Sequence, residues 1–273
     1  QGLTRWPKSP TLVVVKGRSL LAAGDLDGAA AAVDALPAGT DSLELGILRG
    51  ELAIARGDLD GATKLLDEVL TRRPDDIDAL VARAEIDLLR NDPHAAQTRL
   101  EVRYSTQAPP RLTVAYAAAL RQQRRWQDAR VALGRATAGA SGPIAGRAWL
   151  ELARVERDFG DAKKAREAYG KAQEMLSSRD AQREAAVLLV DDGDAIGGRD
   201  ALRKLLDTGP GDGLTMVEAA RALVFTGDLD GARALLDKAA DVATTPAARL
   251  ARERGRVALR RRDFKTAITE LRL

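Results

Sequence analysis

The chain contains no cysteine and only one histidine, and aromatic residues make up only 3% of it. Without cysteine it can form no disulfide, no thiolate metal site and no thiol nucleophile. The longest apolar run near the start, Leu12-Val13-Val14-Val15, is too short to span a bilayer or to form the apolar core of a signal peptide. We therefore expect a soluble chain, and its composition does not decide between the cytoplasm and the periplasm.

Helix-forming residues dominate what is present. Alanine, leucine, arginine and aspartate are abundant, charged residues reach 30%, and the net charge is only +3, so the chain as a whole is not a polycation. The alanine- and arginine-rich composition suggests a bacterial source of high coding GC content. The chain begins at Gln1 and stops at Leu273 within a predicted helix, which indicates a piece of a longer protein.

The hexamer GDLDGA occurs three times, at Gly24–Ala29, Gly57–Ala62 and Gly227–Ala232. We call the last residue of each copy the anchor. Degenerate copies have their anchors at Ala96, Ala129, Ala165, Gly198 and Ala267. Successive anchors are 33, 34, 33, 36, 33, 34 and 35 residues apart. A period in this range is typical of arrays of helix-turn-helix repeats.

Two flanking positions support this period. The residue twelve positions before each anchor is always small: Gly17, Gly50, Ala84, Ala117, Ala153, Ala186, Ala220 and Gly255. The residue four positions after each anchor is always apolar or aromatic: Val33, Leu66, Leu100, Leu133, Tyr169, Leu202, Leu236 and Leu271. A small residue on a first helix lets a second helix approach, and a large residue one turn beyond the anchor fills the remaining space.

The hexamer itself suits the turn between the two helices. Its first glycine ends the first helix in a left-handed conformation, and the aspartate that follows can cap the second helix. The next apolar residue packs the turn. Prolines punctuate the junctions between repeats, at Pro74, Pro109, Pro143, Pro210 and Pro246.

This pattern resembles the tetratricopeptide repeat family over nearly the whole chain. It departs from the family at the early aromatic position, where only Trp149 matches, and the sixth copy is the weakest. The resemblance implies an all-α fold, a right-handed α-solenoid of about eight helix-turn-helix repeats with the last one truncated. We expect one domain over residues 1–273, with repeats near 10–40, 41–75, 76–109, 110–141, 142–178, 179–210, 211–244 and 245–273.

Each repeat is predicted to hold two helices. The predicted pairs are 10–23 with 26–36, 41–56 with 59–72, 76–90 with 93–105, 110–123 with 126–138, 142–159 with 162–177, 180–192 with 195–208, 212–226 with 229–242, and 245–261 with 264–272.

The residues that could carry chemistry are better interpreted as structural. His94 has no partners for a metal site or a general base and reads as a turn residue. Asp191-Asp192-Gly193-Asp194 lacks the alternating ligands and closing glutamate of a calcium loop, and no Gly-Lys-Ser/Thr follows the glycines of 209–213. Trp126 and Trp149 fit core packing. We therefore expect no enzyme, no metal and no cofactor.

In the family, the first helices line a concave binding face. The resemblance places five positions of each repeat there, at eighteen, fifteen, fourteen, eleven and seven residues before the anchor. The candidate partner-binding residues on this face are Glu44, Glu51, Asp78, Glu85, Arg111, Arg147, Arg154, Arg157, Arg221, Arg252 and Arg256. Arg249 and Arg260 join the basic set, and Glu151, Glu184, Glu218 and Glu253 are interleaved with it.

This face is expected to be acidic toward the start of the chain and basic toward the end. One interpretation is that it binds an extended partner of complementary charge through arginine–carboxylate pairs. The other is that these charges pair with each other along the helices, as the spacing of Glu151 with Arg154 allows. The known clamp of the family, which holds a C-terminal carboxylate, is not expected, because Arg18, Leu48 and Glu51 stand at its positions.

Three functions remain open. The first is a non-enzymatic scaffold or adaptor that binds a protein segment, acidic toward the C-terminal half of the face. The second is a docking or regulatory module of a larger enzyme or envelope machine. The third is a nucleic-acid-binding solenoid, suggested by a pI of about 9.3 and by Arg260-Arg261-Arg262, but disfavoured by the interleaved glutamates and scarce aromatics.

Overall fold

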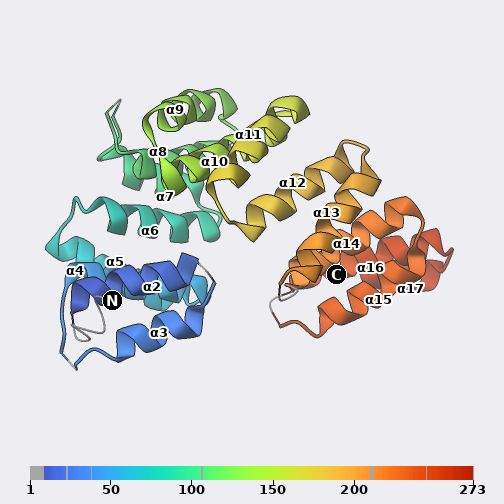
Figure 1. Ribbon diagram of the computed structural model, residues 1–273, viewed down its shortest axis with the longest axis horizontal. Helices are drawn as coiled ribbons and strands as arrows, with labels where there is room; N and C mark the ends of the chain where they lie inside the picture. The colour runs from blue at the N-terminus through green and yellow to red at the C-terminus, as the bar shows by residue number, and fades with distance from the viewer. Residues whose placement is uncertain are drawn as a thin grey trace. The chain divides into compact units, whose positions relative to one another are not determined.

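The computed structural model describes residues 9–22, 24–37, 39–105, 107–209, 212–243 and 245–272. Within them every regular element is helical, and sixteen α-helices, α2 to α17, follow one another (Figure 1). None of these helices combines the length and apolarity that a bilayer crossing needs. The all-α fold expected from the sequence is confirmed. Pro210 and Gly211, which the sequence placed in a loop, lie outside the described residues.

The helices form the pairs that the repeat predicts. The first helices are α2 (Pro10–Ala22), α4 (Leu43–Ala55), α6 (Ile77–Leu89), α8 (Pro110–Gln122), α10 (Gly142–Phe159), α12 (Arg179–Asp191), α14 (Gly213–Thr226) and α16 (Ala247–Arg260). The second helices are α3 (Leu26–Asp34), α5 (Leu59–Arg72), α7 (Pro93–Glu101), α9 (Trp126–Gly139), α11 (Ala162–Met175), α13 (Ala195–Asp207), α15 (Leu229–Ala240) and α17 (Phe264–Leu271). The predicted pairs are confirmed, the weak sixth copy included.

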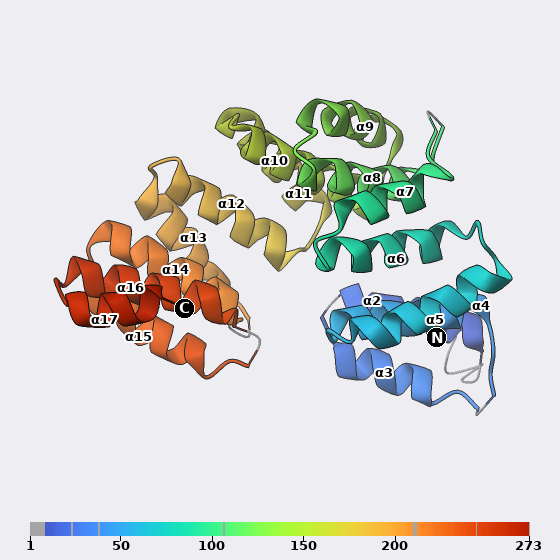
Figure 2. The same cartoon turned by 180° about the vertical axis from the view of Figure 1, so that it is seen from behind.

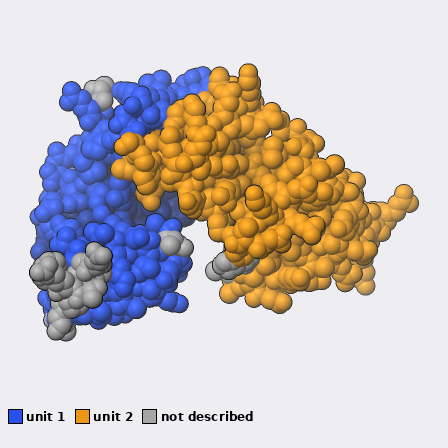
Figure 3. All heavy atoms as spheres, viewed as in Figure 1, with its two compact units in different colours: residues 1–140 blue, residues 141–273 orange. Residues whose placement is uncertain are grey.

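The helices divide into two compact units, which Figure 3 draws in blue and orange. The N-terminal unit is residues 1–140 and the C-terminal unit is residues 141–273. In the N-terminal unit α2 packs on α4, α4 on α6 and α6 on α8 (Figure 2). In the C-terminal unit α12 packs on α14 and α14 on α16. Each unit is thus a stack of helix pairs, while a single right-handed superhelix over residues 1–273 stays a prediction.

The anchors lie at the centre of the core. The anchor alanines of the first five repeats and of the seventh are fully buried, and the anchor Ala267 is 1% exposed. The large residue one turn later is also buried in all but the last repeat: Leu66, Leu100, Leu133 and Leu202 are fully buried. Leu271, at the same position of α17, is 48% exposed, although its side chain still lies against Gly255.

The small residue twelve positions before the anchor is required by close approach. A Cβ added at Gly50 would lie 2.7 Å from Leu66 Cγ, and one at Gly255 would lie 2.6 Å from Leu271 Cγ. Real Cβ atoms do not approach carbon this closely, so the facing leucine would have to move. The sequence prediction that helices meet at this position is confirmed.

The second copy of the hexamer shows how the turn is built. Gly57 adopts a left-handed φ of 79°, and the Asp58 carboxylate accepts a hydrogen bond of 2.9 Å from the Gly61 N–H. Both roles follow the sequence prediction. The same side-chain cap begins the second helix in six other repeats, from Asp25, Asp92, Asp161, Asp194, Asp228 and Asp263. The Asp191–Asp194 stretch is therefore a capped turn, as interpreted.

The second aspartate of the hexamer has a role that the sequence did not reveal. Asp60 pairs with Arg90, which follows the first helix of the next repeat, at 2.5 Å. Two further pairs repeat this contact, Asp27 with Arg56 and Asp230 with Arg261. These aspartates are almost fully exposed, so each pair contributes little free energy. Each of the three identical hexamers thus supplies a left-handed glycine, an aspartate that caps the second helix and an aspartate that contacts the following repeat.

Replacing the cap in one hexamer should destabilise the fold more than replacing the exposed pair. We expect Asp58→Ala to lower the free energy of unfolding by about 1 kcal/mol, because it removes the acceptor for an orphan N–H at the start of α5. Asp60→Ala, two residues away, should cost less than half as much. Urea unfolding followed by circular dichroism measures both, and an equal loss in the two variants would contradict the assignment of the cap.

Candidate functional site

Four charged side chains meet across the first helices of the N-terminal unit. Arg18 of α2 lies 3.3 Å from Glu51 of α4 and 3.0 Å from Asp78 of α6. Arg111 of α8 lies 2.7 Å from the same glutamate and 2.8 Å from the same aspartate. Each arginine therefore contacts both carboxylates, and the two pairs of charges balance.

This arrangement bears on whether the acidic residues predicted in this half are available to a partner. Glu51 and Asp78, two of the four candidate carboxylates, have side chains only 18% and 33% exposed and are neutralised by arginine. Glu44 and Glu85 are exposed. For Glu51 and Asp78 the observed geometry therefore follows the alternative in which the charges of the face pair with each other.

A second network lies inside the C-terminal unit. Arg154 of α10 donates two hydrogen bonds, of 2.9 and 2.7 Å, to the carboxylate of Glu184 on α12, and a third of 3.1 Å to Glu151. The Tyr169 hydroxyl donates to Glu184 at 3.1 Å, and Arg157 lies 3.6 Å from it. Glu184 thus has donors on both oxygens.

The titration of this network reflects those donors. Burial alone would raise the pKa of Glu184, but the hydrogen bonds from Arg154 and the charges of Arg154 and Arg157 lower it below its ordinary value. Burial raises the pKa of the Tyr169 phenol, and the carboxylate of Glu184 adds to that rise. Glu184 is therefore ionised at neutral pH, and the Arg154 guanidinium is held by its two hydrogen bonds to this carboxylate.

Beside this network a hollow of about 370 Å³ is lined from α10, α12, α14 and α16. We call it the charged hollow. Its charged residues are Arg157, Arg221, Arg249, Arg252, Arg256, Asp191, Glu218 and Glu253. Five arginines against three carboxylates leave an excess of two positive charges. Several of them pair within the hollow, Arg249 with Glu218 at 3.0 Å and Arg256 with Glu253 at 2.8 Å.

A second hollow of about 350 Å³ adjoins it and is lined from α14 and α16. We call it the apolar hollow, because Val224, Phe225 and Leu259 form much of its surface. Phe225 is 52% exposed and Leu259 is 45% exposed, which is high for large apolar side chains. The charged and apolar hollows share three lining residues: Arg221, Glu253 and Arg256. Together they offer a surface that is both basic and apolar.

The sequence found most of the charges of this surface but not its apolar part. Four predicted residues, Arg157, Arg221, Arg252 and Arg256, line the charged hollow, whereas Arg154 lies in the neighbouring network and Arg147 is exposed on α10. Phe225 stands seven residues before its anchor, at a position that the family resemblance assigns to the binding face, so the sequence contained a signal for an apolar contact there. Leu259 is one residue away from such a position and carried none.

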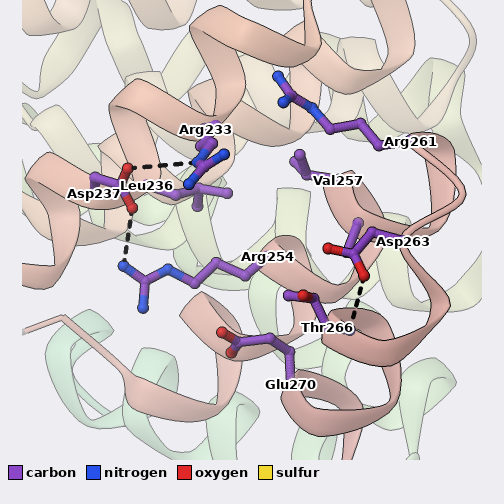
Figure 4. Close-up of a pocket in the computed structure, with 10 residues that line it drawn as sticks. Arg233, Leu236, Asp237, Arg254, Val257, Arg261, Asp263, Thr266 and Glu270 are labelled. Atoms are coloured by element: carbon purple, nitrogen blue, oxygen red, sulfur yellow. Dashed lines mark hydrogen bonds and ion pairs between the residues drawn. The ribbon is translucent and has the colours of Figure 1, made fainter.

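A third hollow, of about 230 Å³, lies between α15, α16 and α17 (Figure 4). Arg254 points across it to Asp237, at 3.2 Å, and Asp263 caps α17 through the Thr266 N–H. Repeat three has the same arginine–aspartate pair, Arg83 with Asp67, but adds Asp87 where the last repeat has Ala258. The ion pair of the third hollow therefore recurs elsewhere in the fold.

No group of three or more histidine, aspartate and glutamate side chains within the described ranges is arranged to hold a metal ion. His94 is exposed in the first turn of α7. Trp149 is partly buried against the core of its repeat, with the Lys171 ammonium 4.0 Å from the ring centroid. These placements agree with the structural interpretations of both residues.

Comparisons with known proteins support the fold. The family model of the tetratricopeptide repeat matches residues 115–178 and 217–273. A tetratricopeptide repeat protein from Parabacteroides merdae is similar over 84% of this chain and 90% of its own, with a TM-score of 0.60 and 17% identity. PilF of Pseudomonas aeruginosa is similar over 72% of this chain and 89% of its own, with a TM-score of 0.53 and 20% identity.

A more distant sequence shares the fold as well. Human IFIT1, solved as a dimer with PPP-AAAA, is similar over 93% of this chain and 66% of its own, with a TM-score of 0.71 and 15% identity. No curated protein matches the chain. At these identities the structural likeness shows the fold alone.

The pKa of Glu184 gives a testable dependence on pH. Because that pKa is lowered in the folded state, the carboxylate stabilises the fold above its unfolded value of about 4.3, and this contribution is lost as the pH falls through the lower folded value. Glu184→Gln should therefore lower the melting temperature at pH 7, and its difference from the wild type should shrink on acidification toward pH 3. Exposed Glu174→Gln is the matched control. A difference for Glu184→Gln that does not change with pH would contradict the assignment.

Proposed function

Because this chain is a tetratricopeptide repeat protein, we propose that it is a non-enzymatic scaffold that binds a segment of a partner protein on the first helices of its C-terminal unit. Stacked repeats present such continuous surfaces for binding. The observation that carries the proposal is the charged hollow, where arginines from α10, α14 and α16 outnumber the carboxylates beside them. The bound segment is acidic.

The geometry of the arginines supports an acidic segment. Arg252 lines the charged hollow, is exposed and makes no ion pair within the described residues, so its guanidinium can donate to a carboxylate without first losing a partner. The Arg249 side chain is 55% exposed, and its Nη1 lies 3.0 Å from Glu218 Oε1. Guanidinium groups bind carboxylates through two parallel hydrogen bonds, which gives orientation as well as attraction.

The alternative of a docking or regulatory module uses the same surface and differs only in what the full protein contains. Nucleic acid fits less well. Binding of single strands relies on several aromatic side chains that stack on successive bases, and Phe225 is the one aromatic side chain that lines the two hollows. IFIT1 was solved with PPP-AAAA, and a fold shared at 15% identity does not extend that ligand to this chain.

The proposal is tested with a fluorescein-labelled peptide of eight glutamates flanked by Gly-Ser, titrated by fluorescence polarisation. Arg252→Glu should weaken binding about tenfold, equivalent to about 1.4 kcal/mol, because an attractive charge becomes repulsive. Arg203→Glu is the matched control, since Arg203 is exposed on α13 and lines neither hollow. Equal affinities for the two variants and the wild type would refute the placement of the site, and stronger binding of an eight-nucleotide RNA would favour the nucleic-acid alternative.

A further inference from the structure

The charged and apolar hollows meet at Glu253, which lines both of them. Glu253 is only 5% exposed, and one of its oxygens, Oε1, accepts a hydrogen bond of 2.8 Å from Arg256 Nη1. Its other oxygen, Oε2, is buried without a hydrogen-bond partner, as is Nε of neighbouring Arg221. A buried acceptor with no donor is rare in folded proteins and costly.

The same position of an earlier repeat shows what complete pairing looks like. Glu184 also stands fourteen residues before its anchor, and it receives hydrogen bonds from Arg154 and from Tyr169 on its two oxygens. At Glu253 the arginine of the preceding repeat, Arg221, turns to Asp191 instead. The result is a buried carboxylate with one free oxygen at the junction of two hollows.

Burial shapes the electrostatics of this carboxylate. Desolvation raises the pKa of Glu253 above its ordinary value, more than the charges of Arg256 and Arg221 lower it, and Glu218 raises it further. A second carboxylate beside Glu253 would add repulsion. A carboxylate of the bound segment therefore fits poorly directly beside Glu253, whereas an N–H donor fits well at that point and the acidic side chains fit at the arginines of the charged hollow.

The apolar hollow specifies the next part of the ligand. Phe225 and Leu259 are about half exposed on its wall, and the Arg221 guanidinium lies 5.7 Å from the centroid of the Phe225 ring. Arg256 and Arg260 complete a basic rim around apolar walls. A large apolar side chain gains by leaving water there, and an acidic residue close to it in sequence can reach the arginines of the charged hollow.

We propose that the C-terminal unit recognises an acidic–any–apolar sequence in an extended segment, with Glu253 accepting the main-chain N–H of the central residue. Alternate side chains of an extended segment project to the same side, so the acidic and apolar side chains can enter the two adjoining hollows together. The proposal rests on the proposed function, because it assigns the chemistry of the partner segment at that same surface. Glu253 and Phe225 become the residues that set specificity.

Three fluorescein-labelled peptides, each flanked by Gly-Ser, separate this inference from the proposed function. Their cores are Glu-Ala-Leu, Glu-Ala-Ser and Gln-Ala-Leu. We expect the first to bind at least tenfold more tightly than either of the others. Equal binding of Glu-Ala-Leu and Glu-Ala-Ser would overturn the inference and leave the acidic-segment function standing. Equal binding of the first and third, or binding by none of the three and by no polyglutamate peptide, would overturn both.

Two phenylalanines of similar exposure provide a matched pair of variants. Phe225→Ser should abolish the preference for Glu-Ala-Leu over Glu-Ala-Ser, because it removes the wall of the apolar hollow. Phe159→Ser should leave that preference intact, since Phe159 is 46% exposed in the same unit but lines neither hollow. Loss of the preference in both variants, or in neither, would contradict the position assigned to the apolar side chain.

Methylation of the central nitrogen of Glu-Ala-Leu tests the contact with Glu253. The N-methyl peptide lacks the proposed donor and should bind the wild type about tenfold more weakly than the parent peptide. In Glu253→Leu, checked for folding by circular dichroism, the two peptides should differ by less than twofold, because the acceptor is gone. Equal binding of both peptides to the wild type would overturn the role of Glu253 without requiring the variant at all.

Discussion

Close approach of helices at a few small residues is the constraint on which the rest of this structure depends. The anchor alanines are fully buried, and the glycines twelve residues earlier leave no room for a side chain in front of Leu66 or Leu271. Because the helices are this close, a repeat needs few aromatic residues to fill its core, which explains how a chain with only 3% aromatics can bury one. The turn that joins the helices must then be short, and a left-handed residue followed by an aspartate cap supplies it.

The same closeness determines where the charges go. Residues one repeat apart occupy equivalent positions on stacked first helices, so Arg18 and Glu51, 33 residues apart, are neighbours, and so are Asp78 and Arg111. Contact across 60 residues, as between Arg18 and Asp78, follows from the same stacking. Side chains so placed lose part of their hydration whether or not they pair, and pairing offsets that loss. Many charged side chains of the first helices consequently form networks of ion pairs rather than rows of independent charges.

Helix ends depend on local signals and ion pairs depend on contacts between repeats, which explains why the sequence predicted the fold more completely than the contacts of the candidate site. Helix ends depend on local signals such as Gly57 and Asp58, and the period repeats those signals along the chain. Ion pairing depends on which of several neighbouring carboxylates an arginine contacts. Arg154 donates to Glu184 of the next repeat. Arg221 has Glu253 at the equivalent position of the next repeat, but it donates to Asp191 of the preceding repeat instead. No spacing rule distinguishes these outcomes. The apolar hollow has another origin: Phe225 stands at a position that the family resemblance assigns to the concave face, but the equivalent positions of the other repeats do not repeat an aromatic residue.

The balance of charges differs between the two units. In the N-terminal unit two arginines and two carboxylates balance each other's charge, although Nε of each arginine is buried without a hydrogen-bond partner. A charged ligand there would have to break contacts of 2.7 to 3.3 Å before making its own. In the C-terminal unit five arginines share three carboxylates, and the Glu253 carboxylate keeps one oxygen unbonded. A ligand therefore gains attraction there without first losing an equal amount. The proposed binding at the C-terminal unit therefore rests on its excess of arginine over carboxylate together with the unbonded oxygen of Glu253.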